Sequence, residues 1–118
     1  MDGACNAVLV KVNQAGTVTE SIACVDAARV AGYDAVVSAR SGETEDVSIS
    51  QLASGLGTGQ LKVGSFTRSE PMAKWNECLR IGESLGPQAC VGGAPLSRTW
   101  WGKAAANRQR RPLETERN

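Results

Sequence analysis

The stretch AVLVKVNQAGTVTESIACVDAARVAG, residues 7–32, decides the fold class of this chain. Its first six residues form an apolar run broken only by Lys11, which predicts a strand buried on both faces, as in parallel sheets. Residues 13–16 are predicted to form a turn, and the sequence TVTE after it fits a capping box at the start of a helix. The alanine-rich helix is predicted to end near Gly32, because glycine is preferred just past a helix end. This order of strand, turn and helix is one βα unit.

Two more units of the same design follow. Residues 35–38 form a short segment, apolar and β-branched, which is predicted as the second strand. A polar loop follows and is predicted to lead into a helix whose first turn carries Glu45 and Asp46. Acidic side chains are favourable in that turn because of the helix dipole. Residues 60–64 are predicted as the third strand, and Ser69 is predicted to cap the helix that comes after it.

The third helix carries an apolar stripe that is expected to contact the core: Met72, Trp75, Leu79 and Leu85. Strand, loop and helix recur about every 25 residues, which is the rhythm of a parallel sheet or barrel. We therefore predict an α/β fold with three parallel strands, paired in sequence order and flanked by helices, in a domain over residues 1–86. Residues 87–118 are rich in Gly, Pro and Arg and are expected to form a loosely held tail.

Composition argues against several classes of protein. The net charge is +1 over 118 residues, so no overall charge attracts nucleic acid or an acidic membrane. The four cysteines are far apart, without a CxxC pair, and the chain has no histidine, which argues against a zinc site or a disulfide framework. The first residues, MDGACNAVLV, lack the basic region and the long apolar run of a signal peptide or membrane span. A cytoplasmic protein with reduced thiols is therefore expected.

Two lysines in strands are the first candidates for chemistry. A lysine within a buried strand must face something polar, because an unpaired buried charge is strongly unfavourable. Side chains alternate along a strand, so Lys11 shares a face with Leu9, and in a barrel it points to the axis near the carboxyl-terminal mouth. Lys62 repeats this arrangement in the third strand. The alternative is that one or both lysines reach solvent from an edge strand.

The loop SARSGETED, residues 38–46, lies between these two lysines in the sequence. Arg40 and Ser41 directly follow a strand and precede a helix, where a guanidinium group, a hydroxyl and free backbone N–H groups can bind phosphate. A capped loop with a surface salt bridge explains the spacing alone equally well. The three carboxylates of the loop fit a solvated first helical turn better than a metal site.

Three long motifs in unbroken order resemble the enolase family. LVKVNQAGTVTES, residues 9–21, is similar to the segment that carries the catalytic lysine on a barrel strand. VVSARSGETED, residues 36–46, is similar to the family loop S-H-R-S-G-E-T-E-D. The last strand and closing helix of the enolase barrel resemble a third stretch, GTGQLKVGSFTRSEPMAKWNECLRIGESLG, residues 57–86. The resemblance covers residues 5–86 and implies the last three strand–helix units of an eight-stranded barrel, here incomplete.

The resemblance also implies roles for individual residues. Lys11 matches the general base that removes the proton from C2 of 2-phosphoglycerate. Arg40 and Ser41 match residues that bind the substrate phosphate, and Ser38 is placed in the same substrate-binding group. Lys62 matches a second lysine, which contacts the substrate near its carboxylate. The implied activity is that of phosphopyruvate hydratase, the reversible dehydration of 2-phosphoglycerate, a small phosphorylated acid, to phosphoenolpyruvate in glycolysis and gluconeogenesis.

Resemblance to the family also implies Mg²⁺, which stabilises the negative charge that develops as the proton leaves. The carboxylates that bind this metal, and the acid that assists loss of hydroxide, are expected on strands that precede this chain. No metal ligand is therefore assigned here, and the chain alone is expected to be inactive. The family is homo-oligomeric, usually dimeric.

Two alternatives stay open. Ala39 stands where the family usually has a histidine that contacts the substrate, and the sequence after Gly86 has no obvious family counterpart. Both departures favour a non-catalytic enolase-like protein with a structural or binding role. The basic segment 100–111, which contains paired tryptophans, has side chains that stack on nucleic-acid bases, although a solvated tail is the better interpretation. Neither a nucleic-acid partner nor a membrane partner is expected.

Overall fold

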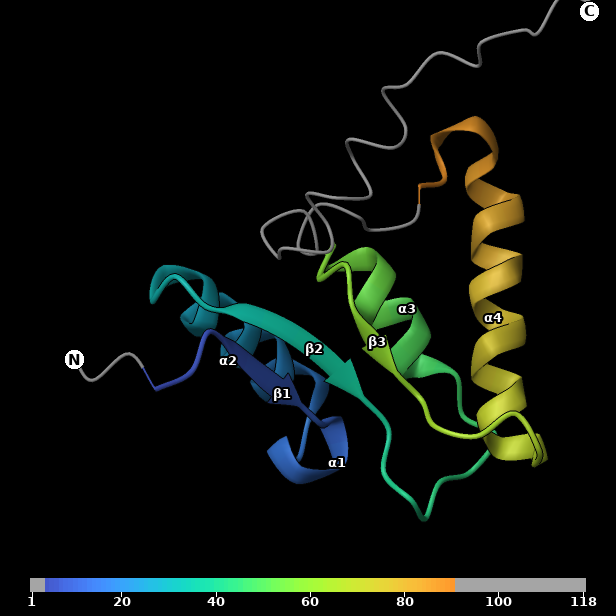
Figure 1. Cartoon of the computed structure of the whole chain (residues 1–118), viewed down its shortest axis with the longest axis horizontal. Helices are drawn as coiled ribbons and strands as arrows, with labels where there is room; N and C mark the ends of the chain where they lie inside the picture. The colour runs from blue at the N-terminus through green and yellow to red at the C-terminus, as the bar shows by residue number, and fades with distance from the viewer. Residues whose placement is uncertain (1–3, 91–118) are drawn as a thin grey trace, which may run out of the picture.

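A three-stranded parallel sheet organises the part of the computed structural model that is described, residues 4–90. Its strands follow sequence order: β1 (Ala7–Val10), β2 (Asp34–Ser38) and β3 (Leu61–Lys62). β1 pairs with β2, and β2 pairs with β3, in both cases parallel (Figure 1). The predicted α/β architecture of three parallel strands in sequence order is confirmed.

Helices cover one face of this sheet. α1 (Val12–Ala15) is a single turn in place of the predicted turn, and α2 (Val18–Val30) packs against β1 and β2. α3 (Ser48–Gly55) packs against β2 and β3, and α4 (Ser69–Leu85) lies alongside α3 (Figure 1). Two apolar clusters fill the space between strands and helices: Val10, Val25 and Ala35 form one, and Val37, Ala39, Ile49, Ala53 and Val63 form the other.

The expectation that the first strand is buried on both faces is wrong. Val10 is 3% exposed and packs against Val25 of α2, whereas Leu9, which points the other way, is 47% exposed. The reason is that α2 covers one side of β1 and no described element covers the other. A continuous apolar run therefore marks a strand here without marking two covered faces.

Both ends of α2 form as predicted. The Thr17 hydroxyl oxygen accepts a hydrogen bond from the backbone N–H of Glu20 at 3.1 Å, and the hydroxyl donates to the Glu20 carboxylate at 2.9 Å. At the other end Gly32 adopts a φ of 77°, and the N–H of Tyr33 donates to the Ala28 carbonyl at 2.8 Å. A positive φ is easily adopted by glycine, so the chain reverses there toward β2.

The start of α3 differs from the prediction. Glu45 and Asp46 were expected in its first turn, but the helix begins at Ser48 and has no acidic residue in that turn. The Asp46 carboxylate accepts a hydrogen bond from the Ser48 backbone N–H at 2.9 Å, and the Asp46 N–H donates to the Thr44 hydroxyl at 3.3 Å. Such side-chain bonds to nearby backbone compete with helix formation, and here they delay its start.

The strand and the helix start of the third unit also differ from their predicted bounds. β3 covers Leu61–Lys62 rather than residues 60–64, and Ser69 is the first residue of α4 rather than its cap, a position held by Arg68. The predicted apolar stripe is partly wrong, because Leu79 is 68% exposed and Leu85 is 47% exposed. α4 instead turns its Pro71 and Lys74 face inward, since it packs against α3.

The predicted tail lies mostly outside the described residues. Within the described part, Gly86–Gln88 form a short 3₁₀ turn, η1, directly after α4. The basic segment 100–111 lies wholly outside the described residues. No helix of the described part is both long enough and apolar enough to cross a membrane.

Packing of α2 on the sheet gives a first prediction. Val25→Ala removes two methyl groups from a side chain that is fully buried, and should lower the free energy of unfolding by about 2 kcal/mol. Val30→Ala is the matched control, because the Val30 side chain on the same helix is 91% exposed and its loss should change stability by less than about 0.5 kcal/mol. Urea unfolding followed by circular dichroism measures both, and equal losses would contradict the described packing of α2.

The hydrogen bond between Ser48 and Asp46 before α3 gives a second prediction. The hydrogen bond from the Ser48 backbone N–H, followed by that from the Ser48 hydroxyl, lowers the pKa of the Asp46 carboxyl from its ordinary value of 3.8. Because the folded pKa is the lower one, the stabilisation is present above pH 3.8 and is lost as the pH falls through the folded pKa. Carboxyl carbon chemical shifts should show Asp46 titrating below pH 3.8.

In Ser48→Ala the pKa of Asp46 should rise part of the way toward 3.8, since the backbone donor remains. Ser54→Ala, at an exposed serine of the same helix, should leave the Asp46 titration unchanged. A wild-type midpoint at or above 3.8 would show that the Ser48 bonds do not form in solution.

Candidate active site

The register of the sheet places three of the predicted site residues in one row. Ser38, the last residue of β2, is the register partner of Lys62 in β3. Lys11 directly follows Val10, whose partner in β2 is Val37, the residue before Ser38. Residues in one row of a parallel sheet share a face, and this row is on the side opposite the helices. It lies at the carboxyl ends of all three strands, where α/β proteins place their ligand sites.

Neither lysine of this row is fully buried, which differs from the expectation of a lysine within a buried strand. Lys11 comes one residue after β1 and caps α1 with an extended backbone, φ −124° and ψ 111°, rather than lying in the middle of a strand. Its side chain is half-buried, and that of Lys62 is exposed. Ser38 is buried instead, and its hydroxyl donates to the Ala39 carbonyl at 2.9 Å. The open face of the sheet leaves both ammonium groups accessible.

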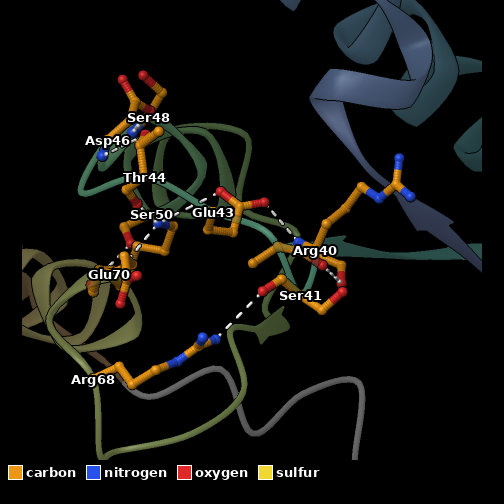
Figure 2. A network of polar contacts seen from close by, with 12 residues as sticks. Arg40, Ser41, Glu43, Thr44, Asp46, Ser48, Ser50, Arg68 and Glu70 are labelled. Atoms are coloured by element: carbon orange, nitrogen blue, oxygen red, sulfur yellow. Dashed lines mark hydrogen bonds and ion pairs between the residues drawn. The ribbon is translucent and has the colours of Figure 1, made fainter.

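Arg40 and Ser41 follow β2 at the same edge of the sheet, and both are exposed. The backbone N–H of Arg40 donates to the Glu43 carboxylate at 2.6 Å, while the Arg40 guanidinium extends away from that carboxylate (Figure 2). The Ser41 carbonyl accepts a hydrogen bond from Arg68 at 3.3 Å. A guanidinium group and a hydroxyl group therefore belong to consecutive residues just after the central strand.

Two polar residues that the sequence analysis did not single out join this loop. Arg68 precedes α4 and reaches the Ser41 carbonyl. Lys74 is 1% exposed, and its ammonium group donates to the Thr44 carbonyl at 2.7 Å and lies 3.5 Å from the Glu43 carboxylate. Lys74 lies one helical turn after Pro71, on the side of α4 that packs inward, but only the structure shows which side this is.

Three cationic side chains at this edge of the sheet have no acidic partner among the described residues. Within residues 4–90, the side chains of Lys11, Arg40 and Lys62 make no hydrogen bond and no ion pair with protein groups. Arg68 reaches only a neutral carbonyl. Lysine and arginine groups without an acidic partner are suited to bind phosphate and carboxylate. These side chains are therefore suited to an anionic ligand.

Metal-binding residues do not gather here. Among the described residues, no group of three or more histidine, cysteine, aspartate or glutamate side chains is placed to hold a metal ion. Glu43 is already bound to Lys74 and to the Arg40 N–H, and Asp46 is bound to Ser48. These residues therefore do not fit a Mg²⁺ site by themselves.

Two further features lie apart from this edge. Ala39 is 4% exposed within the core cluster beside Ile49 and Val63, so its side chain faces the helices. A cavity of about 550 Å³ lies between α3 and α4 and is lined by residues that precede or begin β3, such as Gly57 and Gln60. It is therefore at the amino end of β3, away from the row of lysines.

A comparison with known protein families gives the affiliation of the chain. Residues 1–99 of the 118 match the family described as enolase, C-terminal TIM barrel domain. The match includes the three strand–helix units and the loop that carries Arg40 and Ser41. Three adjacent parallel strands with helices on one face are also what part of such a barrel has. The chain therefore belongs to the enolase family, as part of its C-terminal TIM barrel domain.

Proposed function

We propose that this chain supplies the proton-abstracting and phosphate-binding part of a phosphopyruvate hydratase site. One observation carries the proposal: Lys11 and Lys62 lie in one row at the carboxyl ends of β1 and β3, and Arg40 and Ser41 come soon after the end of β2, the strand between them. This arrangement would surround a small phosphorylated acid with cationic groups on three sides. Family membership supports the assignment of the reaction.

In the proposed reaction, Lys11 acts as the general base. Its neutral amine takes the proton from C2 of 2-phosphoglycerate, and the electron pair of the broken C–H bond moves toward the adjacent carboxylate. The carboxylate then gains negative charge, and the ammonium group of Lys62 is placed to stabilise it. Arg40 and Ser41 bind the phosphate and thereby position C2 in front of Lys11.

The enolase family uses Mg²⁺, which supplies further positive charge at the substrate carboxylate when it is bound. The described carboxylates of this chain do not form a site for it. We therefore place the metal ligands, and the acid that assists loss of hydroxide, on other strands of the barrel. We also propose, from the family alone, a cytoplasmic setting and a homo-oligomeric assembly.

A non-catalytic role is the second candidate, and a specific observation favours it. Ala39 occupies the position at which the family sequence usually has a substrate-contacting histidine, and here it packs in the core. A chain with this loop retains groups for binding a phosphorylated acid but lacks one group that contacts it. In that case the chain would bind the ligand without turnover.

The isolated chain should not form phosphoenolpyruvate, even with Mg²⁺ present. The reason is that electrostatic stabilisation of the developing charge is usually the largest catalytic effect, and loss of one donor already lowers the rate by about 10²–10³. Addition of an enolase polypeptide that carries the remaining barrel strands should restore magnesium-dependent activity. In the restored assembly, Lys11→Ala should lower kcat by at least about 10², and Arg80→Ala, at an exposed arginine of α4, should not.

Three results would decide between the candidates. Turnover by the isolated chain that disappears in Lys11→Ala would refute its predicted inactivity. Full activity of the restored assembly with Lys11→Ala would refute the role of Lys11 as base. Phosphoenolpyruvate binding without turnover in the restored assembly would support the non-catalytic role instead.

A further inference from the structure

We propose that Lys74 is a positioning residue of the phosphate-binding loop, residues 40–46. Its buried ammonium group attaches this loop to α4 and, through Glu43, fixes the backbone of Arg40. The inference rests on the proposed phosphate-binding role of Arg40 and Ser41, and it extends that site to a residue of the last helix.

Lys74 is unusual because a lysine is almost never fully buried without partners. Its side chain is 1% exposed, yet its ammonium group has three oxygen neighbours: the Thr44 carbonyl at 2.7 Å, the Glu70 carbonyl at 3.1 Å and the Glu43 carboxylate at 3.5 Å. An ammonium group has three donor hydrogens, so these neighbours match its full capacity. The charge is therefore held at one position between α4 and the loop.

The Glu43 carboxylate connects this charge to the end of β2. One of its oxygens lies beside Lys74, and the other accepts the backbone N–H of Arg40 at 2.6 Å. The connection fixes the peptide before Arg40, so the side chain of Arg40 leaves the loop on the side away from Glu43 (Figure 2). An ion pair on one side of a carboxylate thus orients the proposed phosphate-binding arginine on the other.

Most residues of this loop are not buried, so burial of side chains does little to hold it. Arg40, Ser41 and Gly42 are all exposed, and so are residues 44–46. The loop is held by polar contacts instead: Arg68 at the Ser41 carbonyl, and Lys74 at the Thr44 carbonyl. A small anion binds more tightly when the protein groups that contact it are already ordered before it binds.

The anchor itself is held by a second helix. The Ser50 hydroxyl of α3 donates to the Lys74 backbone carbonyl at 2.9 Å, and Ser50 is fully buried. α3 and α4 therefore meet at the residue that holds the loop. A buried ion pair contributes little to stability compared with an apolar side chain of similar size, so orientation of the loop is the better explanation for a charge at this position.

The test compares four variants of the full chain with the wild type: Lys74→Met, Glu43→Gln, their combination and Arg80→Met. Arg80→Met is the matched control, because Arg80 forms an ion pair with Glu77 on the same helix but is exposed. The first measurement is amide hydrogen exchange by NMR, which needs no ligand. Lys74→Met and Glu43→Gln should each speed exchange of the Arg40 amide about tenfold, while the Val37 amide in β2 and the Arg80→Met variant stay as in the wild type.

The second measurement is binding of phosphoenolpyruvate and of inorganic phosphate, followed through the Ser41 amide. Both dissociation constants should rise about tenfold in Lys74→Met and in Glu43→Gln, with no change in Arg80→Met. The double variant should bind both ligands no more weakly than Lys74→Met, because both changes break the same connection between Lys74, Glu43 and Arg40. A purely structural lysine would lower stability but leave the affinity of the folded protein unchanged.

Unchanged exchange of the Arg40 amide in folded Lys74→Met and Glu43→Gln would overturn the proposal. Should Lys74→Met lose protection at Val37 and thus fail to fold, Glu43→Gln decides the question alone, since it leaves the buried lysine chain in place. Absence of any phosphate binding by the wild type would refute the proposed binding function of the isolated chain, whereas the exchange rates would still decide whether Lys74 orders the loop.

Discussion

The parallel register of β1, β2 and β3 determines where the core and the charges of this chain lie. Side chains alternate between the two faces of the sheet, and Val10 and Val37 contact the helices. The residues that follow them, Lys11 and Ser38, therefore lie on the other face. A shift by one residue would bury Lys11 beneath α2 and expose Val10. The same register therefore buries the core residues and keeps Lys11 and Lys62 on the face that no described element covers.

The fold was predictable wherever its determinants are local. The strand order follows from the repeated strand–helix units, and the ends of α2 follow from the cap at Thr17 and the glycine at Gly32. The start of α3 was missed because Asp46 binds the Ser48 N–H in a turn before the helix, an alternative that the sequence permits equally well. Exposure of Leu79 depends on which element α4 contacts, which is a property of the tertiary structure.

The same distinction applies to the site. Lys11 and Lys62 were predicted as site residues because a lysine within an apolar strand is a conspicuous local pattern, and Arg40 because it follows a strand and precedes a helix. Lys74 was missed because a lysine in an amphipathic helix usually faces solvent, and only the packing of α4 against α3 shows that this one is buried. Arg68 was missed for a related reason, since its partner is a backbone carbonyl 27 residues away in the sequence.

Ala39 and Lys74 bear on whether binding and catalysis would separate in the proposed site. Ala39, which packs into the core, stands where the resemblance to the family implies a substrate-contacting histidine, whereas Glu43 contacts both Lys74 and the Arg40 N–H. In the proposed site, Arg40 and Ser41 would bind the phosphate, whereas proton transfer by Lys11 would also require its amine to lie at the correct distance from C2. The face of the sheet beside Leu9 is not covered by any described element. In the proposed function, catalysis would therefore depend on what covers this face, whereas phosphate binding would depend on Arg40 and Ser41 of the chain itself.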